Sequence, residues 1–182
     1  MKILKLGQMI GGANSPKPSG LLNEYSINFD GANDKLDCGD SDDFTFGNGT
    51  TDSAFSISAW INVSSLSQTR FIVSKNNTSN HEYTFKVLAN GALNFTLYDG
   101  STSDYAEIQS SSAGTISTGS WFHVVATYSG SLGILGMAIF VNGSALSTSA
   151  ATNNYTAMEN TTAPFLIGHD LESYNDQLNN IY

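Results

Sequence analysis

Apolar and polar residues alternate along several short stretches of this chain, which is the pattern of β-strands that bury one face. From Phe55 to Val63 every second residue is apolar, and the residues between them are mostly polar. Other stretches are dense in aromatic and β-branched residues and end at turns that contain glycine or asparagine. This pattern predicts an all-β protein, with further strands at residues 24–29, 35–38, 70–75, 82–88, 92–98, 106–110, 121–128, 137–141 and 165–168.

The stretch 120–146 contains the strongest pair of predicted strands, Trp121–Tyr128 and Met137–Val141. A strand without a polar face belongs in the interior of a sheet, so we expect the first of these to have a neighbour on each side. Its side chains alternate between two faces, neither of them polar: Trp121, His123, Val125 and Thr127 lie on one, and Phe122, Val124, Ala126 and Tyr128 on the other.

Asn-Gly dipeptides mark two turns. Asn90-Gly91 lies between two predicted strands, and because this pair readily takes positive φ angles it predicts a hairpin with a type I′ turn. Asn142-Gly143 follows the second strand of the central pair. Three longer stretches are interpreted as loops: 39–53, whose four aspartates indicate solvated surface, 99–105, and 147–163, whose length favours a functional role.

The order of residues in the central pair resembles a known family. Gly-Ser-Trp-Phe-His-Val-Val-Ala-Thr-Tyr at 119–128, followed by Ile-Phe-Val-Asn-Gly at 139–143, is similar to the central hairpin of laminin G-like, concanavalin A-like domains. Residues 25–34, 55–61 and 165–168 resemble other strands of that family. The resemblance implies a two-sheet antiparallel jelly-roll β-sandwich. It leaves the function open, because this fold serves lectins, adhesion modules, glycosidase accessories and virion proteins.

We predict two parts: an extended N-terminal arm at residues 1–23 and a laminin G-like sandwich domain at 24–182. Glycine and proline interrupt any long element in the arm. One interpretation is an assembly arm that anchors the domain to a neighbouring subunit; the alternative is a poorly ordered terminus. The apolar residues that would anchor it are Ile3, Leu4, Leu6 and Ile10.

Composition narrows the classes of partner. Only 13% of the residues are charged, so the surface consists largely of Ser, Thr, Asn and Gly, as in secreted or virion β-proteins. The net charge of −9 argues against nucleic acid as a partner, because phosphate contacts need a basic face. The single cysteine, Cys38, cannot form an internal disulfide, and we expect it to be buried.

No apolar run is long enough for a signal peptide or a membrane-spanning helix, so we expect no membrane insertion. A protein made in the cytoplasm with a secreted-type fold is what a phage or virus assembling inside its host would encode. We therefore expect a virion protein, with an extracellular protein as the alternative.

Catalytic signatures are missing from the sequence. A glycosidase needs two carboxylates set across a cleft, and no two glutamates lie on one predicted strand at alternating spacing. The histidines have no spacing that indicates a metal site or a Ser-His-Asp triad, and the resemblance gives His123 a structural role. We therefore predict that the protein is not an enzyme. The glutamates and histidines are Glu24, Glu82, Glu107, Glu159, Glu172, His81, His123 and His169.

Sugar binding needs only an aromatic face and a few amides or carboxylates, and the predicted loops carry such groups. The alternative for two of the aromatic residues, Tyr83 and Tyr98, is that they pair across the Asn90-Gly91 hairpin. Trp60 falls on a mostly polar face, and we expect it to pack under a loop rather than to form a sugar platform. The candidate glycan-binding residues are His81, Tyr83, Tyr98, Asp99, Asp104, Tyr105 and Tyr155.

Calcium is implied by the resemblance only weakly. In many members of the family, an aspartate of the opening turn approaches a calcium ion together with an acidic pair on the last strand. Asp30 stands at the first position, but Asn179 and Asn180 replace the pair, and amides lack the charge that calcium prefers. Asp30 is therefore the one weak calcium candidate, with no other cofactor expected.

The leading expectation is a non-enzymatic virion decoration or tail-associated protein whose lectin-like domain binds host or environmental glycans. Its partners would be other virion or capsid subunits, in an oligomer or larger assembly, because a short closing strand leaves a sheet edge for a neighbouring chain. The alternatives are a purely structural assembly subunit that binds no sugar and a carbohydrate-binding accessory module of a glycan-degrading system.

Overall fold

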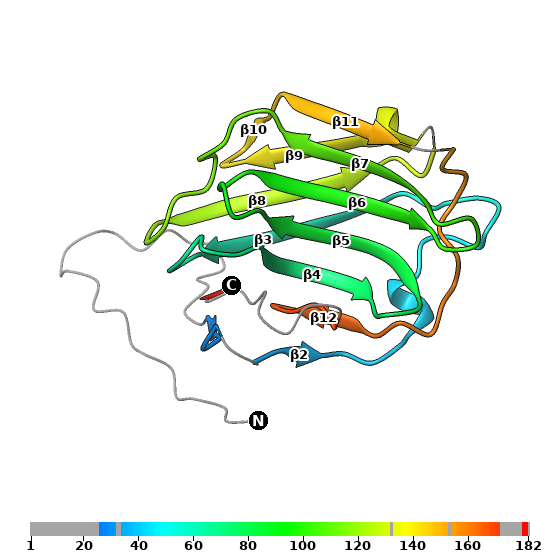
Figure 1. Ribbon diagram of the computed structural model, residues 1–182, viewed down its shortest axis with the longest axis horizontal. Coiled ribbons are helices and arrows are strands. Elements are labelled where there is room, and N and C mark those ends of the chain that lie inside the picture. Colours follow the sequence, from blue (N-terminus) through cyan, green and yellow to red (C-terminus); the bar gives the residue numbers. More distant parts are fainter. Residues whose placement is uncertain (1–25, 32–33, 132, 153, 172–179, 182) are drawn as a thin grey trace, which may run out of the picture.

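Two antiparallel sheets face each other in the computed structural model, which describes residues 26–31, 34–131, 133–152, 154–171 and 180–181 (Figure 1). In the described part of the chain the first sheet has six strands. Their order across the sheet is β1 (Ile27–Asn28), β13 (Asn180–Ile181), β3 (Phe55–Asn62), β8 (Trp121–Tyr128), β9 (Met137–Val141) and β10 (Ser144–Ala145).

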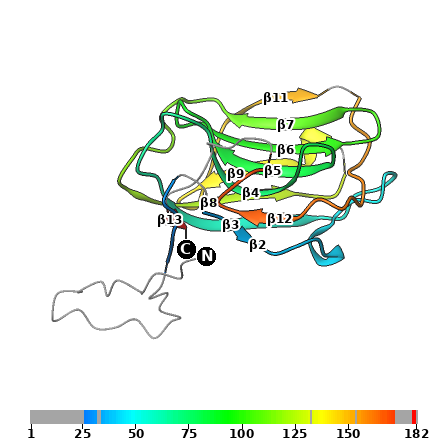
Figure 2. The same ribbon diagram turned by 60° about the horizontal axis from the view of Figure 1, so that its bottom comes forward.

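The second sheet has seven strands within the described residues, and Figure 2 shows β11 at one edge and β2 at the other. Besides the strands there are two short 3-10 helices, η1 (Asp42–Phe44) and η2 (Gly133–Gly136). The predicted all-β jelly-roll sandwich is confirmed. The strand order is β11 (Thr148–Thr152), β7 (Asp104–Ser110), β6 (Leu93–Asp99), β5 (His81–Val87), β4 (Arg70–Asn76), β12 (Phe165–Ile167) and β2 (Leu36–Asp37).

The central pair of strands has the predicted bounds and position. β8 lies between β3 and β9, as a strand without a polar face requires. Val124, Ala126 and Tyr128 on one face are buried in the sandwich, whereas Trp121 and His123 lie on the outer face and are half-buried.

Aromatic rings from both sheets fill the core between them. Phe55 of β3 lies at the centre of this group, with its ring centroid 4.2 Å from that of Phe46 and 5.1 Å from that of Tyr83. Its edge-to-face neighbours are Phe95 of β6 and Tyr128 of β8. Such pairs add to the stabilisation that burial alone provides.

The two Asn-Gly turns differ from each other. At Asn90-Gly91 the hairpin forms as predicted, but only Gly91 has a positive φ, 77°. The Leu88 carbonyl accepts the Gly91 N–H at 2.8 Å, so the tip is a three-residue loop with glycine in the left-handed region. The predicted type I′ turn was therefore wrong there. Asn142 and Gly143, with φ of 49° and 81°, both have the sign that such a turn requires, and they join β9 to β10.

Three other expectations are corrected. The stretch 147–163 contains a strand, β11, which pairs with β7 along its whole length. The stretch 39–53 is not all solvated surface, because Asp52 accepts hydrogen bonds from Tyr128 and from the Met158 N–H. Cys38 is exposed rather than buried.

The predictions for the N-terminal arm, including its apolar residues Ile3, Leu4, Leu6 and Ile10, concern residues outside the described ranges. Among the residues that the structure does describe, no helix is long and apolar enough to cross a membrane.

Candidate functional site

A pocket of about 230 Å³ opens at one end of the seven-stranded sheet, where β5 begins, β6 ends and β7 begins. It contains five of the seven predicted glycan-binding residues. The residues that line it are His81, Tyr98, Asp99, Gly100, Ser103, Asp104 and Tyr105.

Three aromatic side chains from three neighbouring strands form one wall of this pocket. Tyr98 alternates with the buried Leu97, so its ring points away from the core, and Tyr105 lies directly opposite it on β7. The ring of His81 on β5 lies 5.5 Å from the Tyr98 ring, at 44° to it. Because adjacent strands are about 4.8 Å apart, the three rings span roughly 10 Å, the scale of one or two sugar rings.

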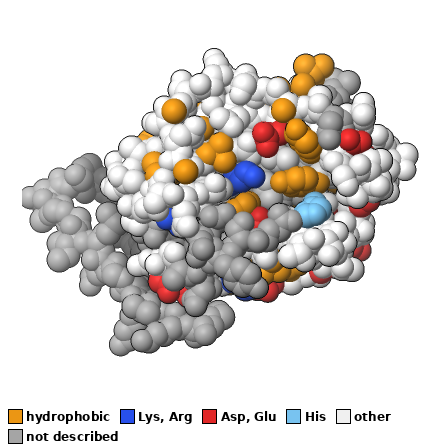
Figure 3. Space-filling model, viewed as in Figure 1, with side chains coloured by type: hydrophobic (Ala, Val, Ile, Leu, Met, Phe, Trp, Pro, Cys, Tyr) orange, Lys and Arg blue, Asp and Glu red, His pale blue; other side chains and the backbone are white. Residues whose placement is uncertain are grey.

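Figure 3 shows the face of the seven-stranded sheet on which these rings lie. Most of this face is neither charged nor apolar; acidic and histidine side chains lie toward one side of it, apolar side chains lie on both sides, and a Lys or Arg side chain lies near its middle. The lining of the pocket combines aromatic surface with carboxylates, which is the mixture that sugar recognition uses.

A chain of hydrogen bonds holds His81 in place. Asn76 donates from Nδ2 to Oδ2 of Asp170 at 3.3 Å, which orients its Oδ1 toward Nδ1 of His81. Since Oδ1 can only accept, Nδ1 carries the proton. Asp170 is 2% exposed, so the anchor of this chain is buried.

Asp99 and Asp104 face each other across β6 and β7 but have different surroundings. Asp99 is 2% exposed and accepts hydrogen bonds from Ser101 Oγ at 2.9 Å and from the Thr156 N–H at 3.2 Å. Burial acts to raise the pKa of Asp99, but these hydrogen bonds outweigh it and the pKa is lowered. Asp99 is therefore an ionised side chain that accepts hydrogen bonds from within the fold.

Asp104 is half-buried, and no hydrogen bond to its carboxylate is found in the part of the chain that the structure describes. The residue before it, Ser103, has a φ of 61°, which is uncommon for a residue other than glycine. Both residues line the pocket, and the carboxylate oxygens of Asp104 can accept hydrogen bonds from a ligand.

Glu159 positions the loop between β6 and β7. Its carboxylate accepts the backbone N–H groups of Gly100 and Ser101, the latter at 3.1 Å. On the other side, Thr152 of β11 donates its hydroxyl to the Tyr105 carbonyl at 3.0 Å. These supporting residues were missed in the sequence because they are 47 to 59 residues away from their partners and carry no local motif.

The remaining two candidates lie elsewhere. Tyr83 is 1% exposed, packs in the core and donates its hydroxyl to the Phe44 carbonyl at 2.7 Å. It lies opposite Leu97 rather than Tyr98, so the alternative cross-hairpin pairing of Tyr83 with Tyr98 was also wrong. Tyr155 is partly buried and donates its hydroxyl to Asp52.

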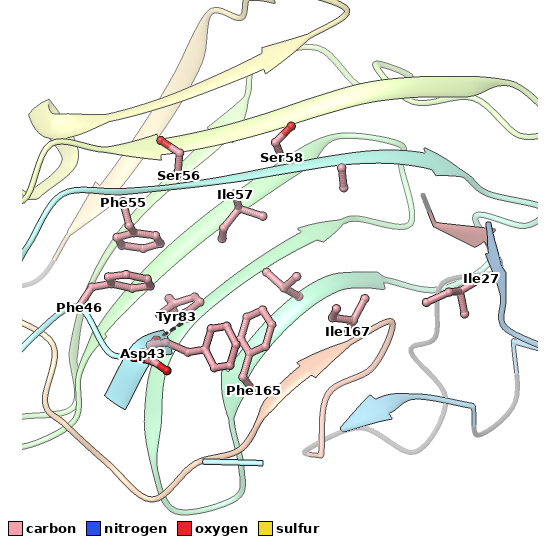
Figure 4. A pocket seen from close by; sticks show the side chains of 13 residues that line it. Ile27, Asp43, Phe46, Phe55, Ser56, Ile57, Ser58, Tyr83, Phe165 and Ile167 are labelled. Atoms are coloured by element: carbon pink, nitrogen blue, oxygen red, sulfur yellow. Dashed lines mark hydrogen bonds between the residues drawn. The ribbon is translucent and has the colours of Figure 1, made fainter. Parts of the chain in front are cut away.

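A second hollow, of about 460 Å³, lies between the two sheets and has a different character (Figure 4). Phe46, Phe55, Tyr83 and Phe165 are among the residues that line it. Because few polar groups converge there, this cleft suits an apolar group rather than a sugar.

Trp60 is not covered in the way that was expected. It is 47% exposed on the outer face of the six-stranded sheet, with its ring 5.3 Å from that of His123. Nε2 of His123 is hydrogen-bonded to Ser58 Oγ at 2.9 Å, and Asn142 Oδ1 accepts the His123 N–H at 3.0 Å. His123 therefore links β3, β8 and the turn after β9.

Asp30 lies in a turn, where its backbone N–H donates to Oδ2 of Asp34 at 3.1 Å. Across the described ranges, no group of three or more His, Cys, Asp or Glu side chains could hold a metal ion. Asn179 lies outside these ranges, so calcium binding by Asp30 stays a prediction.

Comparison with known families agrees with this architecture. Residues 30–179 match the family model of the Concanavalin A-like lectin/glucanases superfamily. The chain therefore belongs to this superfamily and has its lectin-like fold. A search of curated proteins gave no match.

Similar solved structures include domains LG4-5 of the mouse laminin alpha1 chain, with a TM-score of 0.53 and 14% sequence identity over 86% of this chain. The chain spans 38% of that laminin structure. Ruminococcus gnavus IT-sialidase CBM40 has a TM-score of 0.51 and 10% identity, covering 71% of this chain and 74% of the other. At these identities the likeness concerns the fold alone.

Proposed function

We propose that this chain is a non-catalytic carbohydrate-binding domain and that the pocket formed by His81, Tyr98, Asp104 and Tyr105 holds the sugar. The observation that carries the proposal is that aromatic residues from three adjacent strands line one pocket together with a half-buried carboxylate, that of Asp104. Membership of a lectin-like family supports it.

In this proposal the C–H face of a sugar ring packs against the tyrosine rings, while its hydroxyl groups donate to Asp104. The pocket is held in shape by bonds that lie behind it, from Asp170 through Asn76 to His81 and from Glu159 to the loop. A site that is already ordered loses little conformational entropy when the ligand binds.

Two carboxylates near the pocket accept hydrogen bonds from within the fold, and this supports a non-catalytic role for the pocket. Asp99 accepts hydrogen bonds from Ser101 and Thr156, and Glu159 accepts those of two backbone N–H groups. Glycoside hydrolysis needs an acid and a second carboxylate on opposite sides of the bond. Asp104 alone, among the carboxylates that line the pocket, has no hydrogen bond within the described residues.

The test is a glycan array probed with the full chain and with Tyr98→Ala and Tyr105→Ala. Each substitution removes an aromatic face, and we expect binding to fall at least about tenfold. Trp60→Ala is the matched control, because Trp60 is an exposed aromatic residue on the other sheet. A wild-type chain that binds no glycan, or tyrosine variants that bind as well as wild type, would refute the proposal.

A place on a virion, as a decoration or tail-associated protein, is a finer proposal that rests on the uncharged polar composition and the apolar N-terminal stretch. Light scattering during size-exclusion chromatography tests it, on the full chain and on a chain without residues 1–23. We expect the full chain to oligomerise and the shortened chain to be a monomer. A full chain that is monomeric at all concentrations would contradict an assembly role.

A further inference from the structure

We infer that the pocket selects neutral sugars and rejects acidic ones such as sialic or uronic acids. This inference rests on the proposed function and concerns the chemical class of its ligand. It follows from the charge of the pocket and from the positions of the cationic side chains around it.

The charge that lines the pocket is negative. Asp99 and Asp104 lie opposite each other at the end of the sheet, and none of the described lining residues is a lysine or arginine. An acidic sugar would bring its own carboxylate into a site of about 230 Å³ beside two others. Like charges at short range in a partly desolvated site repel strongly.

The lysines of β4 and β5 have contacts of their own within the described residues. The Lys75 ammonium is buried and binds Asp40, Glu82 and the Ala163 carbonyl. Lys86 lies over the ring of Phe71, 5.4 Å from its centroid. Recognition of a sugar carboxylate usually requires such a cation, often in a bidentate contact.

The two aspartates have separate roles in this inference. Asp99 is held by Ser101 and Thr156 and acts as a positioning residue for the loop. Asp104 is the ligand-binding carboxylate, whose two oxygens can accept hydrogen bonds from two neighbouring hydroxyl groups of one sugar ring. A neutral sugar supplies those donors and brings no charge of its own.

Lactose and α2,3-sialyllactose are a matched pair for the first measurement, because they differ by one acidic residue. Each is tested against the full chain at pH 7.5, together with a panel of neutral and acidic oligosaccharides. We expect binding to neutral members of the panel, at least about tenfold weaker binding of each acidic counterpart, and an affinity that hardly changes between about 50 mM and about 500 mM salt.

Asp104→Asn is the decisive variant, because it keeps the size of the side chain and removes its charge. A hydrogen bond to a charged group predicts a loss of about 10- to 100-fold in affinity for the neutral sugar. Asp43→Asn is the control: Asp43 is an exposed aspartate on η1, outside the pocket, and its substitution should leave the affinity unchanged.

The outcomes separate the two proposals. Binding of neutral sugars that Asp104→Asn weakens, with little salt dependence, supports the inference. Tighter binding of the acidic sugars, or unchanged affinity in Asp104→Asn, overturns it while sugar binding itself stands. An array on which neither class binds overturns the proposed function and this inference with it. The salt series needs only the wild-type chain, so the test does not depend on the variant folding.

Discussion

Lys75 is a fully buried lysine at the meeting point of three segments that are distant in the sequence. Its Nζ lies 2.9 Å from Oδ1 of Asp40, 3.1 Å from Oε1 of Glu82 and 2.7 Å from the Ala163 carbonyl oxygen. All three ammonium protons therefore have acceptors. The side chain joins the segment after β2, strand β5 and the segment before β12.

Lys75→Met should destabilise the protein by about 3–5 kcal/mol, because it leaves the carboxylate of Glu82 buried without its cation. Lys86→Met is the control and should cost less than about 1 kcal/mol, since Lys86 contributes only a partly exposed contact with Phe71. Urea unfolding measures both. Addition of Glu82→Gln to Lys75→Met should recover part of the loss, and a Lys75→Met protein as stable as wild type would contradict this account.

At the scale of the element, two glycines with nearly the same backbone angle differ in the space around them. Gly91, with φ 77°, lies where a Cβ atom would approach the Ile116 carbonyl oxygen to 2.5 Å. Gly143, with φ 81°, has nothing within 4 Å of that position. The tip at Gly91 is also tied down, because its carbonyl accepts the Ile116 N–H at 2.8 Å.

Gly143→Ala should therefore cost about 1–2 kcal/mol, the penalty of a left-handed conformation with a side chain. Gly91→Ala should cost about 3 kcal/mol or more, because a backbone carbonyl must also move. Thermal and urea unfolding of the two variants give the comparison. If both substitutions lower the free energy of unfolding by the same amount, the Ile116 carbonyl moves aside at no cost and this account is wrong.

The elements that could be predicted from the sequence are those that bury an apolar face. β3, β8 and β9 carry dense apolar or aromatic patterns, and their bounds came out within a residue of the prediction. β11 was missed because its residues, Thr148–Thr152, are all exposed and carry no alternation of apolar and polar side chains. β11 is held in the sheet by backbone pairing with β7, and such pairing leaves no pattern in the side chains.

The candidate site could be predicted in part for a related reason. His81, Tyr98 and Tyr105 come together because the strands that carry them are neighbours, and the hairpin predicted at Asn90-Gly91 made the pairing of the first two of these strands predictable. The distinction between Asp99 and Asp104 could not be foreseen, since it depends on Thr156 and Glu159 from a distant segment. The sequence likewise predicted a solvated Asp52, because its partners Tyr128 and Met158 are also distant in the sequence.

At the scale of the whole molecule, Asp52 joins parts of the sandwich that the strands leave unconnected. It accepts the hydroxyl of Tyr128 on β8 at 3.0 Å, the hydroxyl of Tyr155, and the Met158 N–H at 2.9 Å. Burial raises the pKa of Asp52 despite these hydrogen bonds. Burial and the nearby carboxylate also raise the pKa of Tyr128 to about 12.

The raised pKa of Asp52 predicts the sign of a pH effect. The folded state holds the proton of this carboxyl more tightly than the unfolded chain, whose aspartates have a pKa of about 3.9. The stabilisation from this group is complete below that pH and is lost as the pH rises through the folded-state pKa. Relative to Asp52→Asn, the free energy of unfolding of the wild type should therefore fall from about pH 4 upward.

Urea unfolding of both proteins, at intervals from about pH 4 to about pH 7, measures this difference. Asp99 acts in the opposite sense, because its lowered pKa stabilises the fold above its unfolded pKa and that contribution is lost on acidification. Asp99 is present in both proteins, and its repulsion of the Asp52 carboxylate is one of the causes that raise the pKa of Asp52. A difference that is flat or rises with pH would contradict the assignment.

Within the described residues, the order of strands gives β1 only β13 as a partner and gives β2 only β12. On a ribosome, β1 and β2 therefore emerge long before these partners, which lie in residues 165–181. The hairpins from β4 to β7 can form early, since their contacts are local. Residues 165–181 supply the strand partners of β1 and β2, so the sandwich closes only after translation has passed β13.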